Sequence, residues 1–302
     1  MWPSREADRL RISNALAVHN LHRQPLPGIS SKSAQEVLAL QIVASLRRED
    51  FYKAIQSKPA ADFRADPLDP RFDPERAVAF HKAAGNLDEA FWLIFLMTHF
   101  AKPADSGWLR LRDFYGKLGS GRWDWATVQN SPNSVNLWLK ANWQNIGGKF
   151  GNHRKYQSLR PGAKLYTGEV VESYVSWIGS GGHAARFSQL TKQGGNDPFD
   201  GLYSAFVVKS FGRLARFDYL MLVSRYGLAN ISPTSAYLSG ATGPRGGVSL
   251  LFTGVIKGPL SPKQLQEKLT MLDDDLGVGM SVLEDSLCNW QKSPNKFVHF
   301  KG

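Results

Sequence analysis

The stretch that decides the fold is DPFDGLYSAFVVKSFGRLARFDYLMLVSRYGLANISPTSAYLSGATGP, residues 197–244. It opens with Asp197 followed by Pro198. This pair predicts a helix start, because aspartate caps free backbone N–H groups and proline suits the first helical position. Apolar residues then recur at helical spacing as far as Val207. We therefore predict a first helix that begins at Pro198.

A second helix follows after a break that has room only for a tight turn. The break is Lys209–Gly212, and the helix is predicted from Arg213 to Tyr226, with Gly227 at its left-handed C-cap. Ser232-Pro233 predicts a third helix through the same capping chemistry. Two helices joined by a tight, glycine-containing turn can offer backbone N–H groups to a phosphate.

One carboxylate lies inside the apolar stripe of the second helix. Asp218 falls among the apolar residues Leu214, Phe217, Met221 and Leu222. A carboxylate on a buried face must be ion-paired, hydrogen-bonded or protonated through a raised pKa. Asp218 is therefore a candidate catalytic residue. The alternative is a structural ion pair with a nearby arginine, the local supply being Arg213, Arg216 and Arg225.

The amino-acid composition limits the kinds of binding partner and the cellular compartment that we expect. The chain has 302 residues, and Lys plus Arg exceed Asp plus Glu by 11, 37 against 26. This balance favours a polyanionic partner, nucleic acid before a membrane surface. The single cysteine, Cys288, excludes an internal disulfide and any cysteine-rich zinc or iron–sulfur site. The polar start, Met1–Arg11, is not a signal peptide, and the longest apolar run, Ala90–Met97, is too short to span a bilayer. We expect a cytoplasmic protein with no cofactor.

The rest of the chain is patterned for helices. FWLIFLMTHF, within Asn86–Phe100, is apolar nearly all round and predicts the central buried helix. The best β-strand candidate is Val248–Val255. We predict a mostly α protein with one core built around 87–100 and 198–226.

Residues 1–75 are expected to form an N-terminal helical extension and linker, and residues 76–302 are expected to form the catalytic domain. Further helices are predicted at 34–48, 108–118, 123–128, 134–146, 169–178, 261–272 and 279–292.

A basic, glycine-rich segment, Gly147–Tyr156, predicts a loop that approaches a phosphate. Its cations Lys149, Arg154 and Lys155 would neutralise phosphate, and Asn152, His153 and Tyr156 would reach a base or a sugar. The alternative is an ordinary basic surface loop. The other candidate DNA contacts are Lys209, Gly212, Arg213 and Arg216 around the turn, and Arg245 in another glycine-rich segment predicted as a loop, GATGPRGG, residues 240–247. That loop lacks the Lys-Ser/Thr of a nucleotide-binding P-loop.

His99 has no second ligand at metal-binding spacing, so we predict no metal site.

Four blocks of sequence resemble a known family. FGNHRKYQSL, FGRLARFDYL, SAYLSGATGP and VGMSVLEDSLCNWQKSP resemble the alpha-glutamyl/putrescinyl thymine pyrophosphorylase family, its third clade in particular, over roughly residues 80–302. The family is similar to helix-hairpin-helix DNA glycosylases. The resemblance implies a glycosylase-like helical architecture. It also implies double-stranded DNA with modified bases as the partner. Some relatives install hypermodified bases of phage DNA, and others excise modified bases in anti-phage defence.

The chain departs from the glycosylase pattern at the hairpin. Such glycosylases have two glycines in the turn, and here only Gly212 fits. Their catalytic aspartate follows the hairpin by about twenty residues, where this chain has Ser232–Ser235 and no carboxylate. A catalytic acid must therefore come from elsewhere. Asp218 is the first choice and Asp200 the second.

Three functions follow. The first is a monofunctional DNA glycosylase that flips out a modified base, such as a glucosylated hydroxymethyl pyrimidine, and hydrolyses its N-glycosidic bond. Asp218 would stabilise the positive charge that develops on the sugar. The second is a transferase that replaces pyrophosphate on an activated 5-hydroxymethyl pyrimidine in DNA, with Lys149, Arg154, Lys155 and Arg245 holding the pyrophosphate. The third is a non-catalytic sensor of modified DNA. No protein partner is evident from the sequence.

Overall fold

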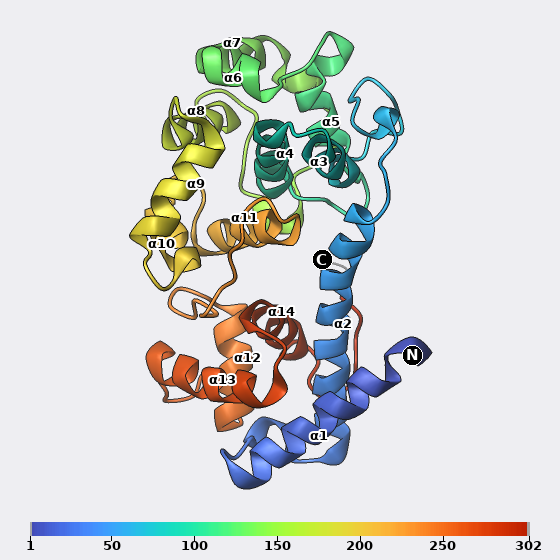
Figure 1. Cartoon of the computed structure of the whole chain (residues 1–302), viewed down its shortest axis with the longest axis vertical. Coiled ribbons are helices and arrows are strands. Elements are labelled where there is room, and N and C mark those ends of the chain that lie inside the picture. The colour runs from blue at the N-terminus through green and yellow to red at the C-terminus, as the bar shows by residue number, and fades with distance from the viewer. Residues whose placement is uncertain (1, 301–302) are drawn as a thin grey trace. The chain divides into compact units, whose positions relative to one another are not determined.

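The chain folds into α-helices joined by turns. The structure, a computed structural model, describes residues 2–300, and within that range it holds fourteen α-helices and no β-strand (Figure 1). The prediction of a mostly α protein is confirmed. The finer prediction, a helix-hairpin-helix glycosylase-like architecture, stays a prediction.

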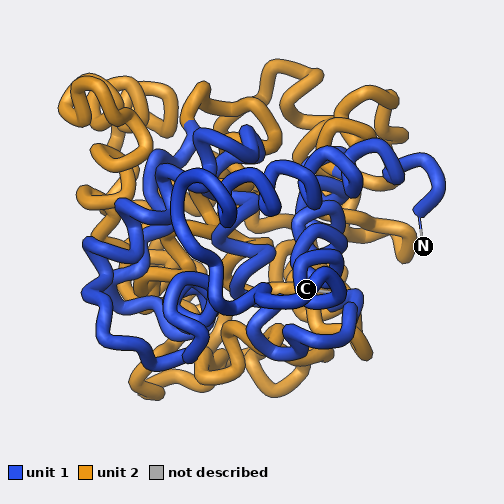
Figure 2. Tube along the Cα trace, turned by 90° about the horizontal axis from the view of Figure 1, so that it is seen from below, with its two compact units in different colours: residues 1–51, 232–302 blue, residues 52–231 orange. Residues whose placement is uncertain are grey.

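Two compact units make up the chain (Figure 2). Unit 1 combines the two ends, Met1–Phe51 and Ser232–Gly302, and unit 2 is the continuous segment Tyr52–Ile231. The predicted boundary between residues 75 and 76 does not coincide with either point at which the chain passes from one unit to the other.

Unit 1 is built around α12, which packs against α14 and α13, while α1 packs against α13. Three of the four glycines of GATGPRGG, namely Gly243, Gly246 and Gly247, lie in the first five residues of α12. A Cβ on Gly247 would lie 2.1 Å from the Leu287 carbonyl oxygen, and one on Gly243 would lie 2.5 Å from Cys288 Sγ. These glycines therefore allow the close approach of α14. The helices of unit 1 are α1 (Glu6–His22), α2 (Lys32–Gln56) as far as Phe51, α12 (Gly243–Thr253), α13 (Pro262–Leu276) and α14 (Met280–Trp290), with 3-10 turns η1 (Pro3–Arg5) and η2 (Pro27–Ile29).

Three predictions fail in unit 1. The segment predicted as a glycine-rich loop is largely the start of α12, and the predicted strand 248–255 lies mostly in the same helix. Its residues Val248, Leu251 and Phe252 are buried on α12, and a short apolar run does not distinguish a buried strand from a buried helix. The third helix predicted at Ser232 does not form. There Ser235 Oγ accepts a hydrogen bond from Tyr237 N at 3.0 Å and Gln266 Oε1 accepts one from Ala236 N at 2.9 Å, so side chains replace the helical acceptors.

Unit 2 is organised around α4, the predicted buried helix. Every residue from Glu89 to Phe100 is buried. The Phe95 ring stacks on Tyr174 at 3.8 Å between centroids and on Phe211 at 5.2 Å. α3 and α11 both pack against α4 (Figure 1). The α-helices of unit 2 are α3 (Pro74–Ala83), α4 (Leu87–Phe100), α5 (Leu109–Tyr115), α6 (Trp125–Asn130), α7 (Pro132–Asn142), α8 (Thr167–Ile178), α9 (Gly182–Gln193), α10 (Pro198–Ala205) and α11 (Arg213–Arg225). Its 3-10 turns are η3 (Asp62–Arg64), η4 (Lys117–Gly119), η5 (Trp143–Asn145) and η6 (Asn152–Arg154).

A buried carboxyl group in α4 makes stability depend on pH. The Glu89 carboxylate accepts hydrogen bonds from the Tyr115 hydroxyl and, at 2.6 Å, from the Trp125 backbone N–H. Burial nevertheless raises the pKa of Glu89 from 4.5 to about 7. Between these two pH values the folded chain holds a proton that the unfolded chain releases, so the free energy of unfolding falls as pH rises.

We expect Glu89→Gln to remove this pH dependence. The amide keeps an acceptor for the Trp125 N–H and gives the Tyr115 hydroxyl a donor, so it fits the same site. Relative to the variant, the wild-type protein should lose up to about 3 kcal/mol of unfolding free energy as pH rises through the window. Urea unfolding of the wild type and of the variant across this pH range measures how the free energy of unfolding of each changes with pH. Parallel slopes would show that Glu89 does not titrate there.

Candidate functional site

The turn between α10 and α11 is tight, as predicted, but a serine takes its left-handed position. Ser210 has φ of 68°, whereas Gly212 is extended with φ of −72°. A Cβ on Gly212 would meet nothing within 4 Å. Neither backbone conformation nor packing in this structure requires glycine there. Its lack of a side chain leaves the N-terminus of α11 open to close approach.

The basic loop packs onto the end of α4. Gly151 N donates to the Phe100 carbonyl at 2.8 Å, and a Cβ on Gly151 would lie 2.6 Å from Ala101 Cβ. The side chain of Arg154 follows and donates from Nε to the Thr98 carbonyl at 3.0 Å. A cation is favourable there because the last carbonyls of a helix carry partial negative charge. Part of this loop is therefore a helix cap.

Arg154 also connects the loop to α11. Its side chain is only 7% exposed, and Nη2 lies 3.2 Å from Asp218 Oδ2. Nη1 donates to the His153 carbonyl at 3.1 Å, so the guanidinium is fixed by three acceptors. The sequence offered an ion pair with Arg213, Arg216 or Arg225 as the alternative role of Asp218. In the structure the arginine that pairs with Asp218 is instead Arg154 of the basic loop.

Asp218 is accessible although protein surrounds it closely. Its side chain keeps 40% of its surface exposed. Desolvation by the surrounding protein raises the pKa of the Asp218 carboxyl, and the positive charge of Arg154 opposes that shift, followed by His153. A carboxyl group that has a raised pKa and remains accessible is a candidate proton acceptor.

A pocket of about 390 Å³ lies where the basic loop meets the turn. The loop contributes His153, Arg154 and Tyr156, and the turn and the start of α11 contribute Gly212 and Arg216. Its volume is in the range of small-ligand sites. The structure thus brings together five of the predicted DNA contacts, with Asp218 paired to one of them.

Two polar residues of the pocket lining, Gln157 and Ser210, escaped the sequence analysis. Gln157 Nε2 donates to Ser210 Oγ, and this bond joins the loop to the turn. Ser210 stands in the predicted break and Gln157 directly follows Tyr156. Their positions next to predicted contacts are the only signal that the sequence offers.

The other predicted DNA contacts in the loop lie outside the pocket lining. Lys149 is 72% exposed and its Nζ lies 2.8 Å from Asp105 Oδ2. Lys155 is exposed and its Nζ lies 5.2 Å from the centroid of the Tyr156 ring. Asn152 is exposed in η6. These three side chains are exposed, and their role in DNA binding stays a prediction.

The remaining predicted residues are more scattered. Lys209 pairs with Glu169, and the Arg213 guanidinium lies 5.1 Å from the centroid of the Phe217 ring. Asp200 lies in the first turn of α10, where its N–H donates to Asp197 Oδ1 at 2.9 Å, and it does not line the pocket. Arg245 is an exposed residue of α12 in unit 1.

The two segments around the pocket are strongly basic. Residues 149–168 and 201–217 together contain eight Lys or Arg residues and no Asp or Glu. Against a net charge of +11 for the whole chain, these segments carry most of the excess. Such a concentration of positive charge favours a phosphate-rich partner.

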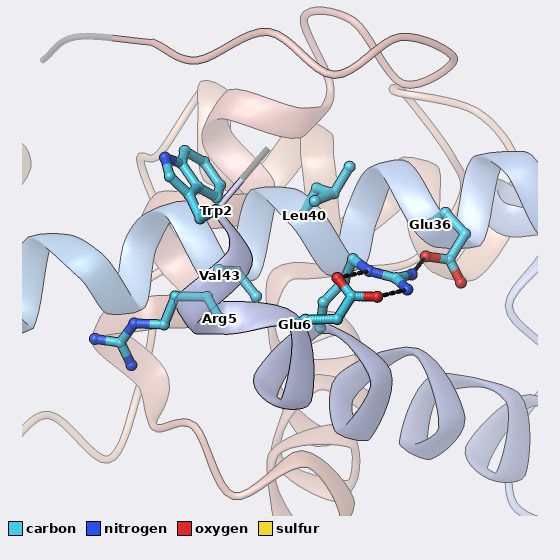
Figure 3. Close-up of a pocket in the computed structure, with 7 residues that line it drawn as sticks. Trp2, Arg5, Glu6, Glu36, Leu40 and Val43 are labelled. Carbon is cyan, nitrogen blue, oxygen red and sulfur yellow. Dashed lines mark hydrogen bonds and ion pairs between the residues drawn. The ribbon is translucent and has the colours of Figure 1, made fainter.

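A pocket in unit 1 has a different electrostatic character (Figure 3). It has a volume of about 260 Å³ and is lined by Trp2, Leu40 and several charged side chains. Arg9 bonds to both Glu6 and Glu36, and Arg5 pairs with Asp8 at 2.9 Å. Glu6 and Glu36 line this pocket beside its arginines, whereas no Asp or Glu among the described residues lines the pocket in unit 2, so this pocket is less suited to a polyanion.

Among residues 2–300, no group of three His, Cys, Asp or Glu side chains could hold a metal ion. His99 is fully buried, with Nε2 3.0 Å from Thr167 Oγ1, and burial lowers its pKa to about 3. It is therefore a neutral core histidine. No helix of the described part of the chain is long and apolar enough to cross a membrane.

Comparison with known families gives one match, and it covers most of the chain. The family model described as alpha-glutamyl/putrescinyl thymine pyrophosphorylase clade 3 matches residues 33–302. This confirms the resemblance carried by the four sequence blocks. Comparison with the curated proteins and with the solved structures finds no significant match.

Proposed function

Because the chain belongs to the alpha-glutamyl/putrescinyl thymine pyrophosphorylase family, clade 3, we propose that it is a DNA-modifying transferase. It replaces pyrophosphate on an activated 5-hydroxymethyl pyrimidine in DNA with an amine. The family description names a pyrophosphorylase and modified thymine, which supports transfer over the base excision that we first considered. Double-stranded DNA is the proposed partner.

The reaction is a substitution at the exocyclic methylene carbon of the pyrimidine. The amine nitrogen forms a bond to this carbon, and the carbon–oxygen bond to pyrophosphate breaks. Pyrophosphate leaves with the bonding electron pair, and the attacking amine loses one proton. A site for this reaction needs cations and N–H groups for the leaving group, and a base for the proton.

The observation that carries the proposal is the Arg154–Asp218 pair beside an open basic pocket. We assign proton removal to Asp218, whose raised pKa suits a general base. Arg154, Arg216 and the N-terminus of α11 at Gly212 would bind pyrophosphate. All four residues fall within 76–302, which we propose as the catalytic region.

Glycosidic cleavage is the second candidate. It is favoured by the same accessible carboxylate, because a glycosylase needs one carboxylate to stabilise an oxocarbenium-like transition state. In this reaction Asp218 would act on the sugar, and an abasic site would remain. Arg154 and Arg216 would then hold DNA phosphates.

The two reactions leave different products from one substrate. We would incubate purified protein with a duplex that carries a 5-pyrophosphorylated hydroxymethyluracil, with and without putrescine or glutamate. Mass spectrometry of the digested DNA should show a heavier nucleoside only when amine is present, together with free pyrophosphate. A released base and alkali-labile strands without amine would support the glycosylase. If the protein binds modified DNA tightly and forms neither product, the result would support the non-catalytic sensor.

A further inference from the structure

The two most exposed large apolar side chains among the described residues of unit 2 are Tyr156 and Val207, at 76% and 73%. Both belong to the segments that form the pocket. Tyr156 lines it, and Val207 directly precedes Val208, which also lines it. The hydrogen bond from Gln157 to Ser210 ties these two segments together.

Their surroundings restrict the partner that could cover them. Apolar side chains with this degree of exposure favour a partner that offers apolar surface. The same two segments hold eight Lys or Arg residues and no Asp or Glu, which favours a polyanion. A nucleic acid combines both properties, because its bases present flat apolar faces and its backbone presents phosphates.

We propose that Tyr156 and Val207 enter the base stack of duplex DNA next to the nucleotide that occupies the pocket. A base inside a duplex cannot be reached for chemistry, so the target must be extruded, which costs unstacking free energy. Proteins repay that cost by inserting apolar or aromatic side chains between base steps. Tyr156 stacks on an exposed base face, and Val207 fills the gap beside it. This inference rests on the proposed function in that it takes duplex DNA as the substrate.

Fluorescence of 2-aminopurine tests the insertion directly. We would place the probe next to a 5-pyrophosphorylated hydroxymethyluracil in a duplex, without added amine, where unstacking increases the emission of the probe. The wild-type protein should increase the emission severalfold. Tyr156→Ala with Val207→Ser should lose most of that increase and bind the duplex about 10-fold to 100-fold more weakly. Its salt dependence of binding should be unchanged, because no phosphate contact is removed. Leu137→Ser, at an apolar residue of α7 that is 59% exposed and lies outside the pocket lining, is the matched control.

A single-stranded substrate separates insertion from a structural role. Once no stack has to be opened, the double variant should lose much less of its transfer rate than it loses on duplex DNA, and the loss that remains reflects the place of Tyr156 in the pocket lining. An equal fluorescence increase for the double variant and the wild type would overturn the proposal. So would an equal loss of rate on single-stranded and duplex DNA. If insertion is seen and no transfer product forms on any DNA, the proposed function fails and the insertion stands.

Discussion

Replacing Asp218 by asparagine is expected to lower the transfer rate about 10³-fold, the loss typical of removing a general base. Asparagine keeps the size of the side chain and leaves an oxygen that can accept from Arg154, so folding and DNA affinity should change little. The carboxylate is the group that can take the proton from the attacking amine. Single-turnover rates on a pyrophosphorylated duplex measure the loss.

The pH dependence provides a second signature of Asp218. Desolvation raises the pKa of this carboxyl above its ordinary value of 3.8, so a fraction of the enzyme carries a protonated, inactive Asp218 at a pH where exposed aspartates are ionised. The rate should therefore fall on the acid side at a higher pH than an ordinary aspartate would give. Asp218→Asn should abolish this acid limb in the residual activity.

Asp200→Asn is the matched control for Asp218→Asn. Asp200 was the second candidate in the sequence, but it lies in the first turn of α10 outside the pocket lining. Its variant should retain the wild-type rate within about twofold, as expected for a group that acts in neither proton transfer nor binding. A large loss in this variant together with an active Asp218→Asn would transfer the role to Asp200.

The sequence predicts those parts of the fold that depend on neighbours along the chain. The capped start of α10, the break before α11 and the buried α4 follow from residues that are close in sequence. α12 does not, because its glycines are explained by the approach of α14 more than thirty residues later. In sequence, glycines that allow helix packing look the same as glycines that form a loop.

The candidate site shows the same limit. Each half is visible in the sequence, as a basic glycine-rich segment and as an acid within an apolar stripe. Their pairing joins Arg154 to Asp218 across 64 residues, and no local pattern predicts which arginine meets this carboxylate. The turn between α10 and α11 shows the same limit of local sequence patterns. The glycine of this turn, Gly212, is extended, whereas Ser210 takes the left-handed conformation and bonds to Gln157.

Replacing Arg154 by alanine is expected to lower both stability and activity. The side chain donates to the Thr98 carbonyl at 3.0 Å, to the His153 carbonyl at 3.1 Å and to Asp218 at 3.2 Å. Its removal leaves a buried carbonyl without this donor and a carboxylate without its cation, so we expect a loss of about 2–3 kcal/mol in urea unfolding. The transfer rate should fall at least about 100-fold, as for loss of a charge-stabilising donor.

Matched variants separate the two roles of Arg154. Arg154→Lys keeps the charge but lacks the planar fork that reaches three acceptors, so its stability should be intermediate. Combining Arg154→Ala with Asp218→Asn removes the charge that was left without its cation, so the double variant should lose less stability than the sum of the single losses, by at least about 0.5 kcal/mol. Lys149→Ala removes only an exposed pair with Asp105 and should change stability by less than about 0.5 kcal/mol. If Arg154→Ala unfolds at the wild-type urea concentration, the guanidinium does not connect α4 to α11. Strictly additive losses would show that the ion pair with Asp218 contributes nothing to that connection.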